Sequence, residues 1–288
     1  MQHSSHHYIL KISCPATSGI VAAVTTFLAQ SGCYISEMAQ FDDEFHERFF
    51  MRAVFRGNSG GELDLAQIEK DFAGVAECFA MQWELHSQAQ PMRVLLMVSK
   101  YDHCLNDLLY RYHKGEMHMQ ITAIVSNHLD LRPMAEREGI RFIYLPVTKD
   151  NKAQQEAELL KIVQDTQTEL VVLARYMQIL SDDLCRHLNG RAINIHHSFL
   201  PGFKGAKPYH QAWDRGVKLI GATAHYVTAD LDQGPIIEQG VERVSHRDDV
   251  ETLRELGQDV ERNALARAVR WHLEDRIIVH GNKTIVFS

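Results

Sequence analysis

The stretch "RVLLMVS", residues 93–99, is a nearly continuous apolar run, and the pattern of the chain changes where it begins. A strand of this composition is typical of a sheet that is covered on both faces. Helical and strand-like patterns then alternate over residues 105–114, 119–126, 131–138, 141–147, 153–167 and 169–174. Because strands that alternate with helices form βαβ units, we predict a doubly wound, largely parallel α/β sheet within residues 93–288.

The N-terminal part of the chain has a different pattern. Strand-like runs at 8–13, 33–41, 48–55 and 77–85 alternate with helical stretches at 18–32 and 62–74. The order β-α-β-β-α-β is the split βαβ arrangement of ferredoxin-like folds. The polar stretch 86–92, which contains a proline, separates the two patterns. We therefore predict an N-terminal domain at 1–85, a linker at 86–92 and a second domain at 93–288.

The segment "CPATSGIVAAVTTFLAQSGCYI", residues 14–35, resembles the start of ACT domains, in which a strand meets Pro15 and a helix begins at Gly19. The resemblance implies a regulatory or oligomerisation domain, with an amino-acid effector as its partner and a homo-oligomer as the assembly. Many ACT domains have an acidic residue soon after this proline, where this chain has Ala16. Two interpretations stay open: an effector-binding domain, and a domain that only pairs subunits.

Composition excludes several classes of function. The formal net charge is −7, without the basic excess typical of proteins that hold nucleic-acid phosphates. No apolar run approaches the roughly 18 residues that span a bilayer. The five cysteines are scattered and the 17 histidines lack HExxH or comparable spacing, which favours free thiols over disulfides or a metal site. We predict a cytoplasmic protein with no nucleic-acid partner, no membrane partner and no metal.

Polar side chains gather where a later strand ends. In "AINIHH", residues 192–197, alternation places Asn194 and His196 on one face, and open α/β sheets bind ligands at the carboxyl ends of their strands. His225 lies on a further strand, and Asp230 and Asp232 lie in the following turn, where an aspartate can also simply bond to the turn backbone. An imidazole near a carboxylate can move protons, and an amide can donate to an oxyanion. These groups suit acyl transfer from an amide without a covalent nucleophile.

The arrangement "NIHHSFLPGFKG … GATAHYVTADLDQGPI" resembles the folate-dependent formyltransferases, over about residues 92–288. The resemblance implies a Rossmann-like formyltransferase domain with Asn194, His196 and Asp232 as catalytic residues. His225 matches a histidine on the strand before the aspartate loop. Asp230 is the weaker match, because the Asp-Gln-Gly-Pro segment starts at Asp232. By strand alternation, His197 returns toward the sheet, and we predict a structural role for it.

The resemblance also implies a substrate pocket. The segment "LARYMQILSDDL", residues 173–184, matches the part that lines the pterin pocket in this family, so its backbone would pair with the pterin edge. The substrate-binding residues implied are Arg175, Tyr176, Met177, Ile179 and His225, with Lys204. Arg175, Lys204 and Lys207 are candidates for binding the glutamate tail of folate.

The acceptor of the formyl group follows from what the sequence lacks. Residues 99–104 contain no glycine and add Asp102, which disfavours a phosphate-bearing acceptor. The negative net charge and the end of the chain at Ser288 disfavour a tRNA as the acceptor of the formyl group. Water remains, and the whole chain then resembles the formyltetrahydrofolate deformylases. That family implies hydrolysis of 10-formyltetrahydrofolate to formate and tetrahydrofolate, in one-carbon metabolism and formate supply for purine synthesis, with folate as substrate and no cofactor.

Two alternatives stay open, one that is also an enzyme and one from a different class of function. A formyltransferase that acts on a non-phosphorylated amine, such as an amino sugar, would use the same residues. A sensor would bind folate without reaction, although a mere binder does not need the complete set of Asn194, His196 and Asp232.

Overall fold

The computed structural model describes residues 6–58, 60–200 and 208–288, and the chain divides into two compact units. Unit 1 comprises Met1–Pro91, Asp275–His280 and Ile285–Ser288, and unit 2 comprises Met92–Glu274 and Gly281–Thr284. Within the described part of the chain, every helix is too short or too polar to cross a membrane.

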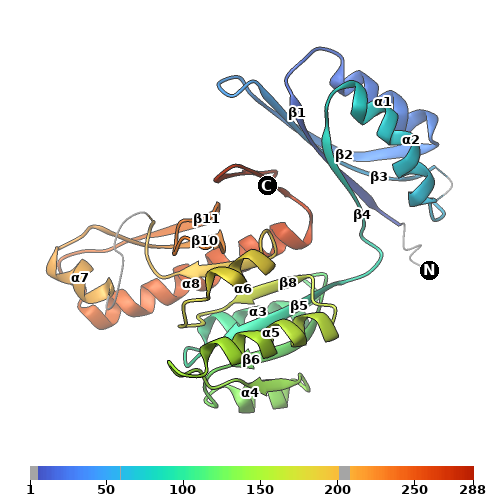
Figure 1. Ribbon diagram of the computed structural model, residues 1–288. Helices are drawn as coiled ribbons and strands as arrows, with labels where there is room; N and C mark the ends of the chain where they lie inside the picture. Colours follow the sequence, from blue (N-terminus) through green and yellow to red (C-terminus); the bar gives the residue numbers. More distant parts are fainter. Residues whose placement is uncertain (1–5, 59, 201–207) are drawn as a thin grey trace. The chain divides into compact units, whose positions relative to one another are not determined.

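Unit 1 is a four-stranded antiparallel sheet with two helices on one face (Figure 1). Its elements are β1 (Tyr8–Pro15), α1 (Ile20–Gln30), β2 (Cys33–Asp43), β3 (Arg48–Gly57), α2 (Leu65–Cys78) and β4 (Gln82–Ser87), and the strand order is β2-β3-β1-β4. The predicted ferredoxin-like order is thus confirmed. The helix α2 runs four residues past the predicted end at 74, because its buried stripe continues from Phe72 to Ala76.

The C-terminal segment contributes to unit 1. Asp275 forms ion pairs with Lys11 (3.1 Å) and His86 (2.8 Å), and its backbone carbonyl accepts a hydrogen bond from Arg52 Nε at 3.0 Å. Residues 275–280 and 285–288 therefore group with this unit rather than with the remainder of 93–288. The division between the units falls after Pro91, within the stretch 86–92 that separates the two sequence patterns.

Unit 2 is a seven-stranded sheet of order β11-β10-β9-β8-β5-β6-β7, and it confirms the largely parallel α/β fold. Strands β9, β8, β5, β6 and β7 pair in parallel, whereas β10 and β11 are antiparallel additions at one edge. The elements are β5 (Met92–Val98), α3 (His103–His113), β6 (Met119–Ser126), α4 (Arg132–Arg137), β7 (Phe142–Tyr144), α5 (Lys152–Asp165), β8 (Leu170–Leu173), α6 (Asp182–His187), β9 (Ala192–His196), α7 (Pro208–Asp214), β10 (Leu219–Tyr226), β11 (Ile236–Arg243) and α8 (Val250–Leu273). A hairpin of β12 (Ile277–His280) and β13 (Lys283–Val286) ends the chain.

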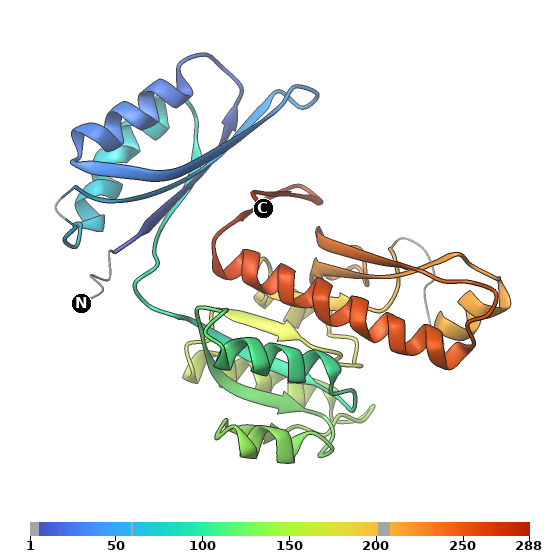
Figure 2. The same ribbon diagram turned by 180° about the vertical axis from the view of Figure 1, so that it is seen from behind.

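Helices cover both faces of this sheet. On one face, α5 and α6 share a buried apolar cluster with β5, β6 and β8. Figure 2 shows α3 and the long α8 on the opposite face. Strand β5, the middle one of the five parallel strands, is accordingly buried on both faces, with Val94 through Val98 at 0% exposure, as its apolar sequence predicts.

Helix α8 lies close to the antiparallel edge of the sheet, where it packs on β10 and β11. A Cβ atom added to Gly240 of β11 would lie 2.7 Å from the Val260 Cγ1 atom of α8, a distance that side chains do not tolerate. The glycine therefore permits the close approach, and the next residue of α8, Glu261, becomes buried at 1% exposure.

Candidate active site

The predicted catalytic side chains come together on two neighbouring strands and one loop. The antiparallel register of β9 and β10 places His225 opposite Asn194 and Thr223 opposite His196. The loop after β10 then brings Asp232 back to these residues. A cavity of about 350 Å³ is lined by every predicted site residue that the structure describes: Arg175, Tyr176, Met177, Ile179, Asn194, His196, His225 and Asp232. Lys204 and Lys207 lie outside the described residues.

The tautomer of His225 is fixed by its two neighbours. Its Nδ1 atom lies 2.9 Å from the Tyr226 carbonyl oxygen, which can only accept, so Nδ1 carries the proton. The Nε2 atom is then an acceptor in the neutral ring, and the Asn194 side-chain amide donates to it at 3.3 Å. The second amide hydrogen of Asn194 stays available for an acceptor in the cavity.

Asp232 and His196 form a carboxylate–imidazole pair. The Oδ2 atom of Asp232 lies 3.2 Å from His196 Nδ1, and its Oδ1 atom lies 3.7 Å from His225 Nε2. Burial raises the pKa of Asp232, but the hydrogen bond from His196 Nδ1 and the proximity of both histidines outweigh burial and hold this pKa well below its usual range. Asp232 is therefore a carboxylate, and His196 donates to it through Nδ1.

The other ring nitrogen of His196 has an unusual environment. Nε2 is buried, and among the described residues no group bonds to it. Since Nδ1 carries the proton, Nε2 presents a lone pair. A buried acceptor without a partner is costly, and its place in the lining of the cavity indicates a ligand or water that donates to it.

The backbone of the aspartate loop is tightly constrained. Asp232 has a φ of 55°, in the left-handed region that aspartate tolerates better than most residues. Two residues later, a Cβ atom added to Gly234 would fall on the Tyr226 carbonyl oxygen, which belongs to the backbone and cannot move aside cheaply. The direction of the Asp232 carboxylate thus depends on a glycine at 234.

Gly234→Ala is expected to lower kcat by more than tenfold and to destabilise the fold by about 1–3 kcal/mol, because the clash forces the loop away from β10. Steady-state kinetics and thermal unfolding measure the two effects. Gly190→Ala, at a turn with a φ of 74° and in open space, strains the backbone without a steric clash, and it is the control for a loss of stability that leaves kcat unchanged. Unchanged kcat in the Gly234 variant would show that the loop position does not matter.

The segment after β8 forms one wall of the cavity. Met177 and Ile179 remain 48% and 60% exposed, so apolar surface is open to a flat ligand. The Met177 backbone N–H donates to Ser99 Oγ at 2.9 Å, and Ser99 in turn donates to Asn127. This backbone donor is therefore engaged by the protein rather than open for the pterin edge.

Arg175 is buried, whereas a residue that binds the glutamate tail of folate must be open to the ligand. It is 7% exposed, its Nε atom lies 3.2 Å from Glu261 Oε2, and its Nη1 atom lies 2.6 Å from His197 Nδ1. Because buried protein groups occupy the guanidinium, we do not assign it to the glutamate tail of folate.

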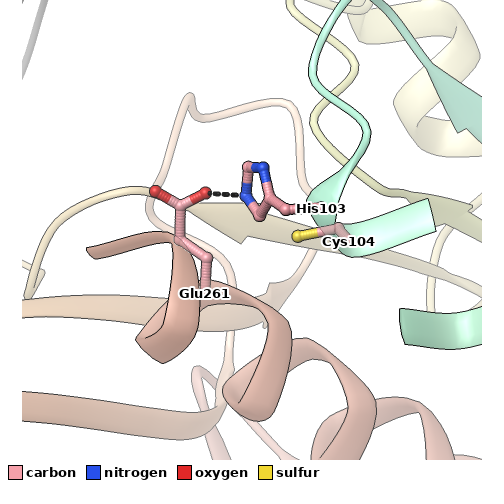
Figure 3. A group of neighbouring side chains, drawn as sticks. All are labelled: His103, Cys104 and Glu261. Carbon is pink, nitrogen blue, oxygen red and sulfur yellow. Dashed lines mark hydrogen bonds and ion pairs between the residues drawn. The ribbon is translucent and has the colours of Figure 1, made fainter. Parts of the chain in front are cut away.

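Sequence reasoning missed a buried group behind the site. Figure 3 shows the side chains of His103, Cys104 and Glu261, whose donor atoms lie within 4.8 Å of one another. The residues come from the start of α3 and from α8. The one available signal was Glu261 itself, a charged residue on the apolar face of a helix between Gly257 and Leu265.

The chemistry of this group suits a hydrogen-bond network better than a metal. Glu261 is already bonded by His103 (2.7 Å) and Tyr209 (2.7 Å) and is neutralised by Arg175. Burial, followed by the charge of Glu261, raises the pKa of the Cys104 thiol, whereas a metal ligand must be a thiolate.

Comparisons with known proteins identify chains that are similar to this one. The formyl transferase family model matches residues 92–269. The chain is 50% identical over 279 residues to the formyltetrahydrofolate deformylase of Corynebacterium sp. (strain P-1), and the alignment covers 97% of each protein. A crystal structure of a formyltetrahydrofolate deformylase from Pseudomonas syringae pv. tomato has a TM-score of 0.95 and 49% identity, covering 99% of this chain and 95% of that one.

A more distant similarity extends to a transferase. Glycinamide ribonucleotide transformylase 1 from Symbiobacterium toebii has a TM-score of 0.65 and 28% identity, and the match covers 71% of this chain and 98% of that one.

Proposed function

Since the chain belongs to the formyltetrahydrofolate deformylases, a family within the formyl transferases, we propose that it hydrolyses 10-formyltetrahydrofolate to formate and tetrahydrofolate. The observation that carries the proposal is the set of Asn194, His196 and Asp232 in the lining of one cavity, with the lone pair of His196 Nε2 unpartnered among the described residues. The exposed side chains of Met177 and Ile179 supply an apolar wall of the kind that a folate ring system requires.

In the first step, His196 Nε2 accepts a proton from a water molecule whose oxygen attacks the formyl carbon. The formyl oxygen gains the electron pair of the C=O double bond, and the free amide hydrogen of Asn194 donates to it. A tetrahedral intermediate results. In the second step, the oxyanion re-forms the C=O double bond, the bond between this carbon and N10 breaks, and N10 receives the proton from His196. Tetrahydrofolate and formic acid leave, and formic acid releases its remaining proton to solvent as formate.

Asp232 acts through His196 in this scheme. Its pKa is held too low for it to be an effective base near neutral pH. Its contribution is to orient the imidazole through Nδ1 and to stabilise the imidazolium that forms when water is deprotonated. His196 is thus the base, and the Asp232 carboxylate orients it and stabilises its protonated form.

The remaining features of the proposal rest on sequence. Folate is the substrate and no further cofactor takes part, while Lys204 and Lys207 meet the glutamate tail. The five free cysteines support a cytoplasmic location, where the product formate supplies purine synthesis. Unit 1 serves as the ACT domain that pairs subunits into a homo-oligomer, and an amino acid is the class of effector that such a domain would take.

The decisive experiment is formate release from 10-formyltetrahydrofolate by the purified protein, with no amine present. We expect catalytic release of one formate for each tetrahydrofolate formed. Tight folate binding without formate would contradict hydrolysis and would direct the search to an amine acceptor.

A further inference from the structure

Glu261 is a buried carboxylate that ties three segments of unit 2 together. His103 at the start of α3 lies 2.7 Å from its Oε2 atom, Tyr209 of α7 donates to Oε1 at 2.7 Å, and Arg175 after β8 forms the ion pair at 3.2 Å. Burial raises the pKa of Glu261, but the hydrogen bond and charge of His103 and the charge of Arg175 outweigh burial and lower it. An ionised carboxylate at 1% exposure needs partners of this kind.

Arg175 connects Glu261 to His197, which lines the cavity. Its backbone has a φ of 68°, a left-handed conformation that is uncommon for arginine, and its guanidinium lies over the Tyr101 ring at 5.1 Å. From this position Nη1 reaches His197 Nδ1 at 2.6 Å. Arginine has no acceptor and keeps its protons, so His197 Nδ1 must be the acceptor. His197 is therefore neutral, with its proton on Nε2.

His197 is adjacent to the proposed base. Its ring stacks on the ring of His196, with centroids 5.0 Å apart and an interplanar angle of 23°, and both rings line the cavity. A positive charge on His197 would oppose protonation of His196, which is the step that activates water. The charge state of His197 therefore affects how readily His196 accepts a proton.

We propose that Glu261 and Arg175 are positioning residues for the reaction, which hold His197 as a neutral imidazole with its proton on Nε2 and so keep positive charge off the ring that stacks on the base. The proposal rests on the proposed function in its effect on turnover, but the state of His197 is a property of the folded protein alone. It replaces the structural role that strand alternation predicts for His197.

The charged groups around His197 act in opposite directions, and those that lower its pKa outweigh those that raise it. Burial lowers the pKa of His197 to about 4, followed by the charges of Arg175 and His196, while Glu261 and Asp232 oppose the shift. The centroid of the Tyr209 ring lies 6.4 Å from the centroid of the His197 ring. With a folded-state pKa this low, the ring is neutral throughout the neutral range and becomes charged only in strong acid. Removing the guanidinium raises the pKa of His197 toward its ordinary value.

The test variant is Arg175→Met combined with Glu261→Gln, because removing both charges leaves no lone buried ion. Histidine is labelled with nitrogen-15, and the His197 signals are assigned by their loss in His197→Asn. In the unmodified protein we expect the neutral Nε2–H tautomer to persist down to about pH 5. In the double variant we expect the titration to move upward by about one unit, because the loss of the Arg175 hydrogen bond and charge outweighs the loss of the Glu261 charge, which opposes the shift.

The kinetic counterpart is the acid limb of kcat/KM against pH. The double variant should move this limb upward in the native background and leave it unmoved in the His197→Asn background. Tyr209→Phe, which removes one Glu261 hydrogen bond but neither charge, is the matched control and should leave the His197 titration within a few tenths of a unit. Thermal unfolding and folate binding establish that each variant is folded.

Three results would overturn the proposal: a native His197 that titrates near its ordinary value, an acid limb that moves equally in the His197→Asn background, or a Tyr209→Phe shift as large as that of the double variant. Failure of formate release would overturn the proposed function instead, since the nitrogen-15 titration needs no turnover.

Discussion

Replacing Asp232 by asparagine is expected to lower kcat by about a thousandfold, within the range that a positioned acid–base pair contributes. The amide keeps the shape of the side chain but removes the charge that stabilises the His196 imidazolium. It can also turn its NH₂ group toward His196 Nδ1, which reverses the proton pattern and leaves Nε2 as a donor instead of a base. Folate binding should change little, because the apolar wall at Met177 and Ile179 is untouched.

Asp230→Asn is the matched control for this experiment. Asp230 is exposed, lies in the same loop two residues away and is outside the cavity lining. Formate release by this variant should stay within about twofold of the native rate, since a surface substitution of this kind perturbs little. Equal losses in the two variants would point to the loop as a whole rather than to the Asp232 carboxylate.

Asn194→Ala has the second largest expected effect, a fall in kcat of about 10²–10³-fold, which is the usual value of one oxyanion donor, about 2.7–4 kcal/mol. The donor acts only once the formyl oxygen has become charged, so the loss should fall on kcat and leave the Kd for folate nearly constant. Pre-steady-state binding and turnover measurements separate these two quantities.

The control for Asn194 is Asn189→Ala, an exposed asparagine after α6. It should leave both kcat and stability close to native. A loss of folate affinity in Asn194→Ala that matches its loss of turnover would mean that Asn194 binds the ground state, and the oxyanion assignment would then be wrong.

The low pKa of Asp232 has a further kinetic meaning. A carboxyl group with a lowered folded-state pKa keeps its charge until the solution becomes strongly acidic. Loss of activity between about pH 8 and 5 therefore reports titration of other groups, among which histidine is the natural candidate.

The sequence predicts the framework of this molecule well because the framework depends on local patterns. The apolar run 93–99 identifies a strand buried on both faces, and that strand is β5, the middle one of the five parallel strands. Alternation in 192–197 predicts that Asn194 and His196 share a face, and both line the cavity. The family motif adds Asp232, which no spacing rule connects to β9.

The groups behind the cavity depend on distant partners and were beyond such rules. Alternation predicts that His197 faces the sheet, yet β9 ends at His196, so the period of two no longer applies to the next residue. Arg175 looks like a surface cation in sequence, and only the fold reveals Glu261 beneath it. Helix α7 and the β12–β13 hairpin were also not predicted, since each is too short to show a periodic pattern.

The position of Glu261 on α8, far along the chain from its partners, limits when its interactions can form during synthesis. Its partner His103 is separated from it by 158 residues, and the two meet only when α8 has packed on the antiparallel edge of the sheet. A chain synthesised only as far as Asp232 contains Asn194, His196 and Asp232, but it still lacks Glu261, the ion-pair partner of Arg175. The ion pair that anchors Arg175 therefore cannot form until residue 261 has been synthesised and α8 has packed against α3.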